Sequence, residues 1–171
     1  PFVFANQAGV QASPANKYKF LIICTPVKAY YSENVNVLIS EKYSRAANGG
    51  VGFAKAAGNY AAQFYPTSLA QKKGYEQIIW TDANNHEYLE EAGTMNIFFR
   101  IGNNLITAPN NDRILDGVTR KSVIDLCRYL NINIEIRPIS IKELISAHND
   151  KSLKEIFGSG TAVVILPIKS F

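Results

Sequence analysis

The sequence is poor in several features that would assign it to a particular class of protein. It holds two cysteines and one methionine, and its longest apolar runs, such as FLIIC and AVVILPI, are far shorter than the roughly 20 residues of a membrane-spanning helix. Cys24 and Cys127 lack the spacing of metal ligands, so we expect two buried thiols and no metal site. No charged segment followed by an apolar one opens the chain. We therefore expect a soluble, cytoplasmic protein with no membrane partner.

Charge of one sign is not concentrated anywhere in the sequence. Eighteen Lys and Arg residues stand against fourteen Asp and Glu residues, and the net charge is only +4. Nucleic-acid binding usually needs a basic patch or stripe, so we expect no nucleic-acid partner. The hydrophobic content of 47% over 171 residues is enough for one domain with a substantial core.

The start of the sequence indicates a piece of a longer protein. The single methionine, Met95, lies deep in the chain, so we do not expect Pro1 to be a translation start. Residues 1–16, PFVFANQAGVQASPAN, are mostly small and polar with a proline near the end, which predicts an extended interdomain linker. We expect residues 17–171 to form one domain.

Strand and helix patterns are interleaved after residue 17. Helical spacing of apolar residues predicts helices near 59–73, 118–130 and 141–148. The strands are predicted near 18–25 and 35–40, in two hairpins within 76–90 and 94–109, and over INIEIRPI and TAVVILPI. In the second hairpin, Met95, Ile97 and Phe99 share one strand face, opposite Thr94 and Asn96. This order predicts an α/β or α+β domain with a mixed, largely antiparallel sheet.

The stretch GFAKAAGNY, residues 52–60, is the first candidate for chemistry. The small residues around Lys55 leave space for another molecule and allow close approach to the backbone. A lysine in a confined site loses hydration, its pKa falls, and it can act as a Schiff-base nucleophile or a general base. Tyr60, early in the predicted helix, could point its hydroxyl into the same space. The alternative is a glycine-rich loop before a helix, with Tyr60 in the core.

Three further stretches carry groups that could bind a ligand: a pair of carboxylates and two candidate sites for an anion. Glu90 and Glu91 in EEAGTMN supply carboxylates, although such a pair is also typical of a solvated turn. Gly117 and Thr119 in RILDGVTR start a predicted helix, whose free N–H groups and dipole favour a phosphate, unless the residues there act only as a cap. The turn in FGSGTAVVI could present N–H groups to a carboxylate, or be purely structural. Together with Lys55 these groups match what pyridoxal phosphate requires.

Over nearly its whole length the sequence resembles the class IV, or fold-type IV, pyridoxal-phosphate aminotransferases, and in particular the branched-chain amino-acid aminotransferases. Four motifs carry the resemblance in the family's order: GGVGFAKAAGNYAA for the lysine, EEAGTMNIF for the glutamate, ILDGVTR for the phosphate and FGSGTA for the substrate carboxylate. The resemblance implies the large C-terminal domain of this fold, a pseudo-barrel with flanking helices. It also implies a small N-terminal domain, absent from this chain, which supplies an arginine to the phosphate.

The resemblance implies a role for each motif residue. Lys55 would hold pyridoxal 5′-phosphate as an aldimine and carry the proton between substrate and cofactor. Tyr60 would hydrogen-bond the ring oxygen, and Glu91 would contact the pyridine nitrogen. The remaining implied contacts are those of Thr94, Leu115, Gly117, Val118, Thr119 and Thr161 with the cofactor, and those of Tyr30, Thr161 and Ala162 with the substrate.

One departure from the family pattern lies in the phosphate motif. Asp116 stands where many relatives have proline. Its carboxylate could add a negative charge beside the phosphate site, or face away as a helix cap.

The implied activity is transfer of the amino group of leucine, isoleucine or valine to 2-oxoglutarate by a homodimer, in branched-chain amino-acid biosynthesis. A D-amino-acid aminotransferase, an aminodeoxychorismate lyase and a non-catalytic domain of the same fold are the alternatives. Without the small domain, we expect the fragment alone to bind the cofactor weakly and to be poorly active.

Overall fold

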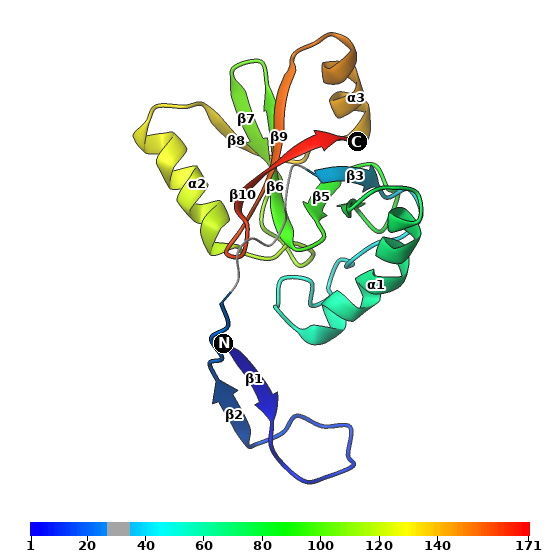
Figure 1. The fold of residues 1–171 in the computed structure, drawn as a ribbon, viewed down its shortest axis with the longest axis vertical. Helices are drawn as coiled ribbons and strands as arrows, with labels where there is room; N and C mark the ends of the chain where they lie inside the picture. The colour runs from blue at the N-terminus through cyan, green and yellow to red at the C-terminus, as the bar shows by residue number, and fades with distance from the viewer. Residues whose placement is uncertain (27–34) are drawn as a thin grey trace. The chain divides into compact units, whose positions relative to one another are not determined.

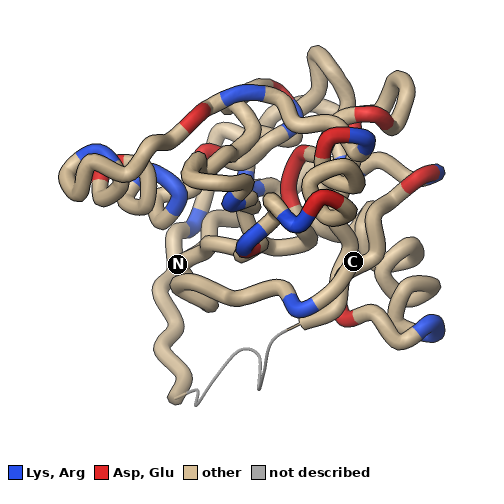
Figure 2. Tube along the Cα trace, turned by 90° about the horizontal axis from the view of Figure 1, so that it is seen from above, with Lys and Arg blue, Asp and Glu red and all other residues tan. Residues whose placement is uncertain are grey.

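The computed structural model describes residues 1–26 and 35–171. Contacts within the chain divide it into two units, Pro1–Tyr30 and Tyr31–Phe171. Basic and acidic positions are interspersed along the trace rather than gathered by sign (Figure 2). Within the described ranges, no helix combines the length and apolar character needed to cross a membrane, and no cluster of three metal-ligating side chains occurs.

The first unit contains a two-stranded antiparallel sheet. Strand β1 (Phe2–Ala5) pairs with β2 (Tyr18–Leu21), with Phe2 opposite Leu21. The stretch predicted as an extended linker over residues 1–16 thus begins with a strand, because the apolar start FVFA pairs with YKFL while the small and polar residues form the connecting loop. Cys24 is exposed, so the prediction of two buried thiols is correct only for Cys127.

The strand pairings of the second unit close a six-stranded barrel, and Figure 1 shows how its strands are arranged. The strand order is β5-β4-β3-β10-β9-β6, and β6 pairs back with β5 to close the ring. Within the ring only β10–β3 and β3–β4 are parallel. The strands are β3 (Val35–Ile39), β4 (Gln77–Thr81), β5 (Leu89–Ala92), β6 (Met95–Ile101), β9 (Leu153–Gly160) and β10 (Val164–Ser170). The expected mixed, largely antiparallel pseudo-barrel is confirmed.

Strand β6 divides its pairing between two neighbours along one edge. Its first residues pair with β5, with Glu91 opposite Asn96, and its last residues pair with β7 (Asn104–Thr107). Where the two partners separate, the Thr107 hydroxyl donates to the carbonyl oxygen of Ile97 at 2.8 Å. Strand β8 (Ile134–Ile136) then extends the sheet beside β7 in parallel.

The core follows the alternation read from the sequence of β6. Met95, Ile97 and Phe99 lie in the main apolar cluster with residues of β3, β4, β5 and β10. On the opposite face, Phe98 packs with Ile124 and with Cys127 of α2 (Val118–Tyr129). Strand β6 is therefore buried on both faces, which fixes the position of the neighbouring Glu91.

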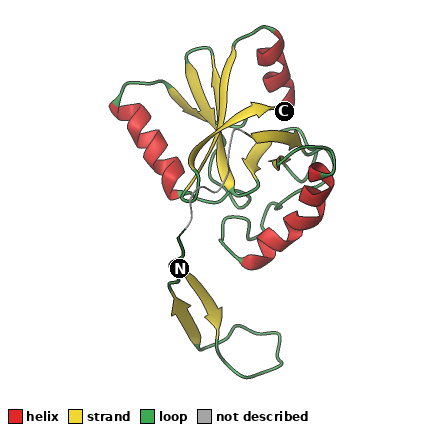
Figure 3. Cartoon of the chain, in the orientation of Figure 1, coloured by secondary structure: helices red, strands yellow, loops and turns green. Residues whose placement is uncertain are grey.

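Helices cover the outside of the strands (Figure 3). In α1 (Ala57–Gln71), Ala70 packs on Ile78 and Trp80 of β4. Leu144 of α3 (Ile141–Asn149) joins the main cluster. All three helices predicted from apolar spacing are confirmed, with their ends within two residues of the expected positions.

Strand β9 is a finding that the sequence patterns did not predict. It begins with the exposed charges of Lys154 and Glu155 and ends in Gly-Ser-Gly, so neither end reads as a buried strand. The glycines are needed because β9 passes close to β6: a Cβ at Gly158 would lie 2.6 Å from the Met95 sulfur. The turn expected at FGSG instead follows Gly160.

Helix α3 offers a test of local stabilisation. The Ser140 hydroxyl accepts a hydrogen bond from the Glu143 N–H at 3.0 Å, as an N-cap does. We expect Ser140→Ala to lower the free energy of unfolding of the whole protein by about 1 kcal/mol in urea titrations. Ser146→Ala, at an exposed position of the same helix, is the control. Equal losses in the two variants would show that the cap contributes nothing.

Candidate functional site

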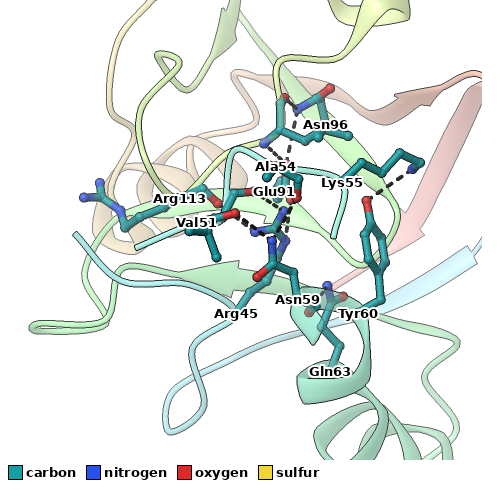
Figure 4. Close-up of polar contacts among 12 residues, drawn as sticks. Arg45, Val51, Ala54, Lys55, Asn59, Tyr60, Gln63, Glu91, Asn96 and Arg113 are labelled. Carbon is teal, nitrogen blue, oxygen red and sulfur yellow. Dashed lines mark hydrogen bonds and ion pairs between the residues drawn. The ribbon is translucent and has the colours of Figure 1, made fainter. Parts of the chain in front are cut away.

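Lys55 and Tyr60 face each other across the start of α1 (Figure 4). The Lys55 ammonium nitrogen lies 3.2 Å from the Tyr60 hydroxyl and 5.0 Å from the centroid of its ring. Tyr60 lies in the first turn of the helix and is half-buried rather than in the core. Lys55 is exposed, contrary to the expected confinement, because the small residues around it, 56–58, are themselves exposed.

Asn59 fixes the loop that carries the lysine. Its side-chain amide donates to the carbonyl oxygens of Val51 at 2.7 Å and Ala54 at 2.8 Å. These bonds satisfy two loop carbonyls and tie the loop to the first turn of α1 (Figure 4). The sequence places Asn59 at the start of the predicted helix but does not predict these bonds, although its position between Gly58 and Tyr60 is a usable signal.

Glu91 lies in β5 with its carboxylate buried and surrounded by donors. Its Oε1 is 2.6 Å from the Arg45 Nε, and its Oε2 accepts from the Leu115 N–H at 3.0 Å and from the Asn96 amide at 3.3 Å. Burial raises the pKa of Glu91, and the charges of Arg45 and Lys55 with the Leu115 N–H hold it back to about 7. The ammonium of Lys55 is thus close enough to act on this carboxyl.

The neighbouring Glu90 is also buried and pairs with the Arg113 side chain. Burial raises the pKa of Glu90, against the effect of its bond with Arg113. Both carboxylates therefore belong to the interior, and the alternative of a solvated turn is wrong. Two successive strand residues reach different partners because their side chains leave the strand on opposite faces.

The sequence did not identify Arg45 as a site residue. In the structure its side chain is buried, with only 1% exposed. Besides its ion pair with Glu91, it donates from Nη1 to the Arg113 carbonyl oxygen at 2.9 Å and from Nη2 to the Gly52 carbonyl oxygen at 2.8 Å. No motif contains it, and an arginine ten residues before Lys55 gives no signal of its own.

The start of α2 has the properties of an anion site. Its N-cap residue is Gly117, no side chain caps it, and its first turn holds no acidic residue. Asp116 turns away to Lys121 and Asn110, and the bond with Lys121 lowers its pKa. The unusual aspartate in the phosphate motif is therefore compensated by a lysine and does not act as the cap. Val118 and Thr119 form the first turn, so their N–H groups point to this end of the helix.

Asn96 links the glutamate to this helix start. Its amide donates to the Leu115 carbonyl oxygen at 2.8 Å as well as to Glu91. A Cβ at Gly117 would lie 2.0 Å from the Asn96 side-chain oxygen, so glycine allows the two segments to meet. Asn96 was predicted to share a strand face with Thr94, which was a usable signal.

The last motif reaches the same region through β9. Ser159 lies opposite Asn96, and its buried hydroxyl has no hydrogen-bond partner among the described residues. A Cβ at Gly160 would lie 3.4 Å from the Thr94 carbonyl oxygen, so the turn between β5 and β6 is adjacent to the turn between β9 and β10. Thr161 and Ala162 follow in the exposed turn between β9 and β10. Tyr30, expected in the substrate pocket, lies outside the described residues.

This arrangement joins a lysine and a tyrosine, a buried carboxyl group with a pKa of about 7, and a helix start with no side-chain cap. Contacts between the segments thereby hold together an amine that reacts with carbonyl groups, a group that binds a protonated ring nitrogen and a place for a phosphate. Backbone groups take part in both polar networks: the Leu115 N–H donates to Glu91, and the Val51 carbonyl oxygen accepts from Asn59.

The chain matches proteins and structures of one family. Over 98% of its length, the chain is 44% identical to a Staphylococcus aureus protein named "Probable branched-chain-amino-acid aminotransferase". Over the same share it is 42% identical to "Branched-chain-amino-acid aminotransferase 2" of Bacillus subtilis. The match covers 48% and 47% of these proteins, so the chain spans about half their length. The crystal structure of the Escherichia coli branched-chain amino acid aminotransferase is 31% identical, with a TM-score of 0.70 over 81% of this chain and 44% of that one.

The family model for "Amino-transferase class IV" matches residues 1–171. The chain therefore belongs to the class IV aminotransferases.

Proposed function

We propose that the protein containing this chain is a pyridoxal-phosphate-dependent branched-chain amino-acid aminotransferase. It would move the amino group of leucine, isoleucine or valine to 2-oxoglutarate. The observation that carries the proposal is the convergence of Lys55, Tyr60, Glu91 and the uncapped start of α2, each a member of a motif found in the sequence. The names of its relatives support the choice of substrate.

The residues present fit the cofactor. Lys55 would bind its aldehyde carbon, Tyr60 its ring oxygen, Glu91 its pyridine nitrogen and the first turn of α2 its phosphate. The fit rests on the lack of a cap or an acidic side chain at α2 and on the unpartnered hydroxyl of Ser159 beside Asn96. When bound, the cofactor supplies a ring that withdraws electrons from the substrate α-carbon.

The chain's own groups would then bind the substrate and move protons. The Lys55 amine would be the base that takes the proton from the substrate α-carbon. The Tyr60 hydroxyl, 3.2 Å away, restricts where that amine can lie. The N–H groups of Thr161 and Ala162 would hold the substrate carboxylate. Thr94, Leu115 and Val118 would line the cofactor beside the groups already named.

We further propose that the protein acts as a cytoplasmic homodimer and that a second, smaller domain completes the site. The support for the second domain is that the relatives are about twice as long as this chain. Without it, a wall of the site and an arginine for the phosphate would be missing, which agrees with the exposure of Lys55.

The test is a half-reaction on the whole protein loaded with pyridoxal phosphate. We expect L-leucine, L-isoleucine and L-valine each to release one equivalent of the corresponding 2-oxo acid per site and to bleach the visible absorbance of the cofactor. Adding 2-oxoglutarate should restore the absorbance and release L-glutamate.

Two other substrates separate the alternatives. Reaction with D-alanine but not L-leucine would indicate a D-amino-acid aminotransferase, and release of pyruvate from aminodeoxychorismate would indicate a lyase. Binding of the cofactor without reaction with any of these amines would contradict the proposal.

A further inference from the structure

The Arg45 side chain contacts three separate segments of the second unit. Its Nε lies 2.6 Å from Glu91 on β5, its Nη2 binds the carbonyl oxygen of Gly52 in the lysine loop, and its Nη1 binds that of Arg113 before α2. These segments carry the groups proposed to bind the ring nitrogen, the aldehyde and the phosphate. A single buried group thus joins the three parts of the site (Figure 4).

The charge of Arg45 also acts on the Glu91 carboxyl. A buried carboxylate is costly unless a cation or donors compensate it. Three charged groups act on Glu91: Arg45 and Lys55 favour its ionised form, and Glu90 opposes it. Glu90 has its own partner in Arg113, so Arg45 is the cation in direct contact with Glu91.

We propose that Arg45 is a positioning residue that favours the ionised form of Glu91 and holds the lysine loop and the segment before α2 around it. The inference rests on the proposed function, since the basic ring nitrogen of the proposed cofactor is the group that an ionised Glu91 would bind. Lysine could not replace arginine, because its single ammonium group cannot reach three acceptors in a fixed plane. Arg45 need not touch the cofactor itself.

The first measurement uses the cofactor-free whole protein. A ¹³C NMR titration of labelled glutamate carboxyls, with Glu91 assigned by its absence in Glu91→Gln, should give a midpoint near the pKa of about 7. In Arg45→Met the midpoint should rise by at least about one unit, because the largest influence lowering the pKa is removed. In Arg45→Lys the midpoint should rise less than in Arg45→Met, since lysine keeps a cation near the carboxylate.

The second measurement is the affinity for pyridoxal phosphate, followed by absorbance. We expect both variants to bind it about 10- to 100-fold more weakly, as when residues that orient ligand-bearing side chains are lost from metal sites. The matched control is Arg113→Met, which also breaks an ion pair with a neighbouring buried glutamate but leaves the backbone acceptor of Arg45 in place. It should lose stability while keeping the Glu91 midpoint.

The outcomes separate this inference from the proposed function. An unchanged Glu91 midpoint and wild-type affinity in Arg45→Met would overturn the inference alone. Equal losses of affinity in Arg45→Met and Arg113→Met, with no difference in the Glu91 titration, would reduce Arg45 to a structural role and also overturn it. If wild-type protein binds no pyridoxal phosphate, the proposed function fails. Should Arg45→Met not fold, Arg45→Lys carries the test, and wild-type affinity in that variant would contradict the inference.

Discussion

Lys55→Ala is expected to abolish transamination by the whole protein, lowering kcat/KM for L-leucine by more than about 10⁴-fold, the upper range of general acid–base catalysis. The loss should be this large because one side chain is proposed both to bind the cofactor and to move the substrate proton. The Tyr60 hydroxyl lies 3.2 Å from the ammonium, and it cannot take over as an amine. The measurement is coupled detection of the 2-oxo acid, together with the cofactor's absorbance before and after borohydride treatment.

The control for this variant is Lys72→Ala. Lys72 is an exposed lysine at the end of α1, so the two variants remove the same charge at opposite ends of one helix. We expect wild-type activity for Lys72→Ala, and no borohydride-fixed cofactor for Lys55→Ala. A Lys55→Ala protein that retains both activity and fixed cofactor would refute the assignment of the lysine.

Gly52→Ala is expected to lower the free energy of unfolding by about 3 kcal/mol, near the upper end of the cost of overpacking. A Cβ at Gly52 would lie 2.5 Å from the Ala46 Cβ, 2.7 Å from the Asp112 carbonyl oxygen and 2.8 Å from the Arg113 Cα. Two of these atoms are backbone and cannot rotate away. The Phe53 N–H also donates to the Asp112 oxygen at 3.0 Å, so the two loops cannot separate without losing a hydrogen bond.

The matched control is Gly58→Ala in the first turn of α1. A Cβ there would meet no atom within 4 Å, and alanine favours the helix, so stability should be unchanged or raised by up to about 1 kcal/mol. Urea unfolding of the cofactor-free whole protein measures both variants. If Gly52→Ala were as stable as Gly58→Ala, the close contact between the lysine loop and residues 112–113 would be wrong.

The sequence predicts the fold best where periodicity is strong. Alternating apolar residues predict β6, and helical spacing predicts α1, α2 and α3, each of which buries one face. Strand β9 escapes this reasoning: it is stabilised by pairing with β6 and β10, and its sequence carries charges and glycines. The closure of the barrel also depends on which strands meet, which local pattern does not reveal.

The residues of the candidate site were also only partly predictable from the sequence. Lys55, Tyr60 and Glu91 could be found because their motifs combine reactive groups with glycines and turns. Arg45 could not, since its role comes from contacts with backbone carbonyl groups, one near it in the sequence and one far away, and any residue type can supply a carbonyl. Whether Lys55 is confined also could not be predicted, because it depends on the segments that surround the side chain and not on the small size of its neighbours in the sequence.

The division of β6 between β5 and β7 has a consequence for how such enzymes can diversify. Glu91 and Asn96 stand where the two neighbours part, on strands whose backbone bonds are completed on both sides, with Thr107 serving the carbonyl at the junction. The group proposed to meet the ring nitrogen therefore belongs to the rigid frame, whereas Thr94, Thr161 and Ala162 lie in turns at its rim. We therefore expect changes in those turns to alter which amino acid the proposed enzyme accepts while the frame that holds Glu91 stays in place.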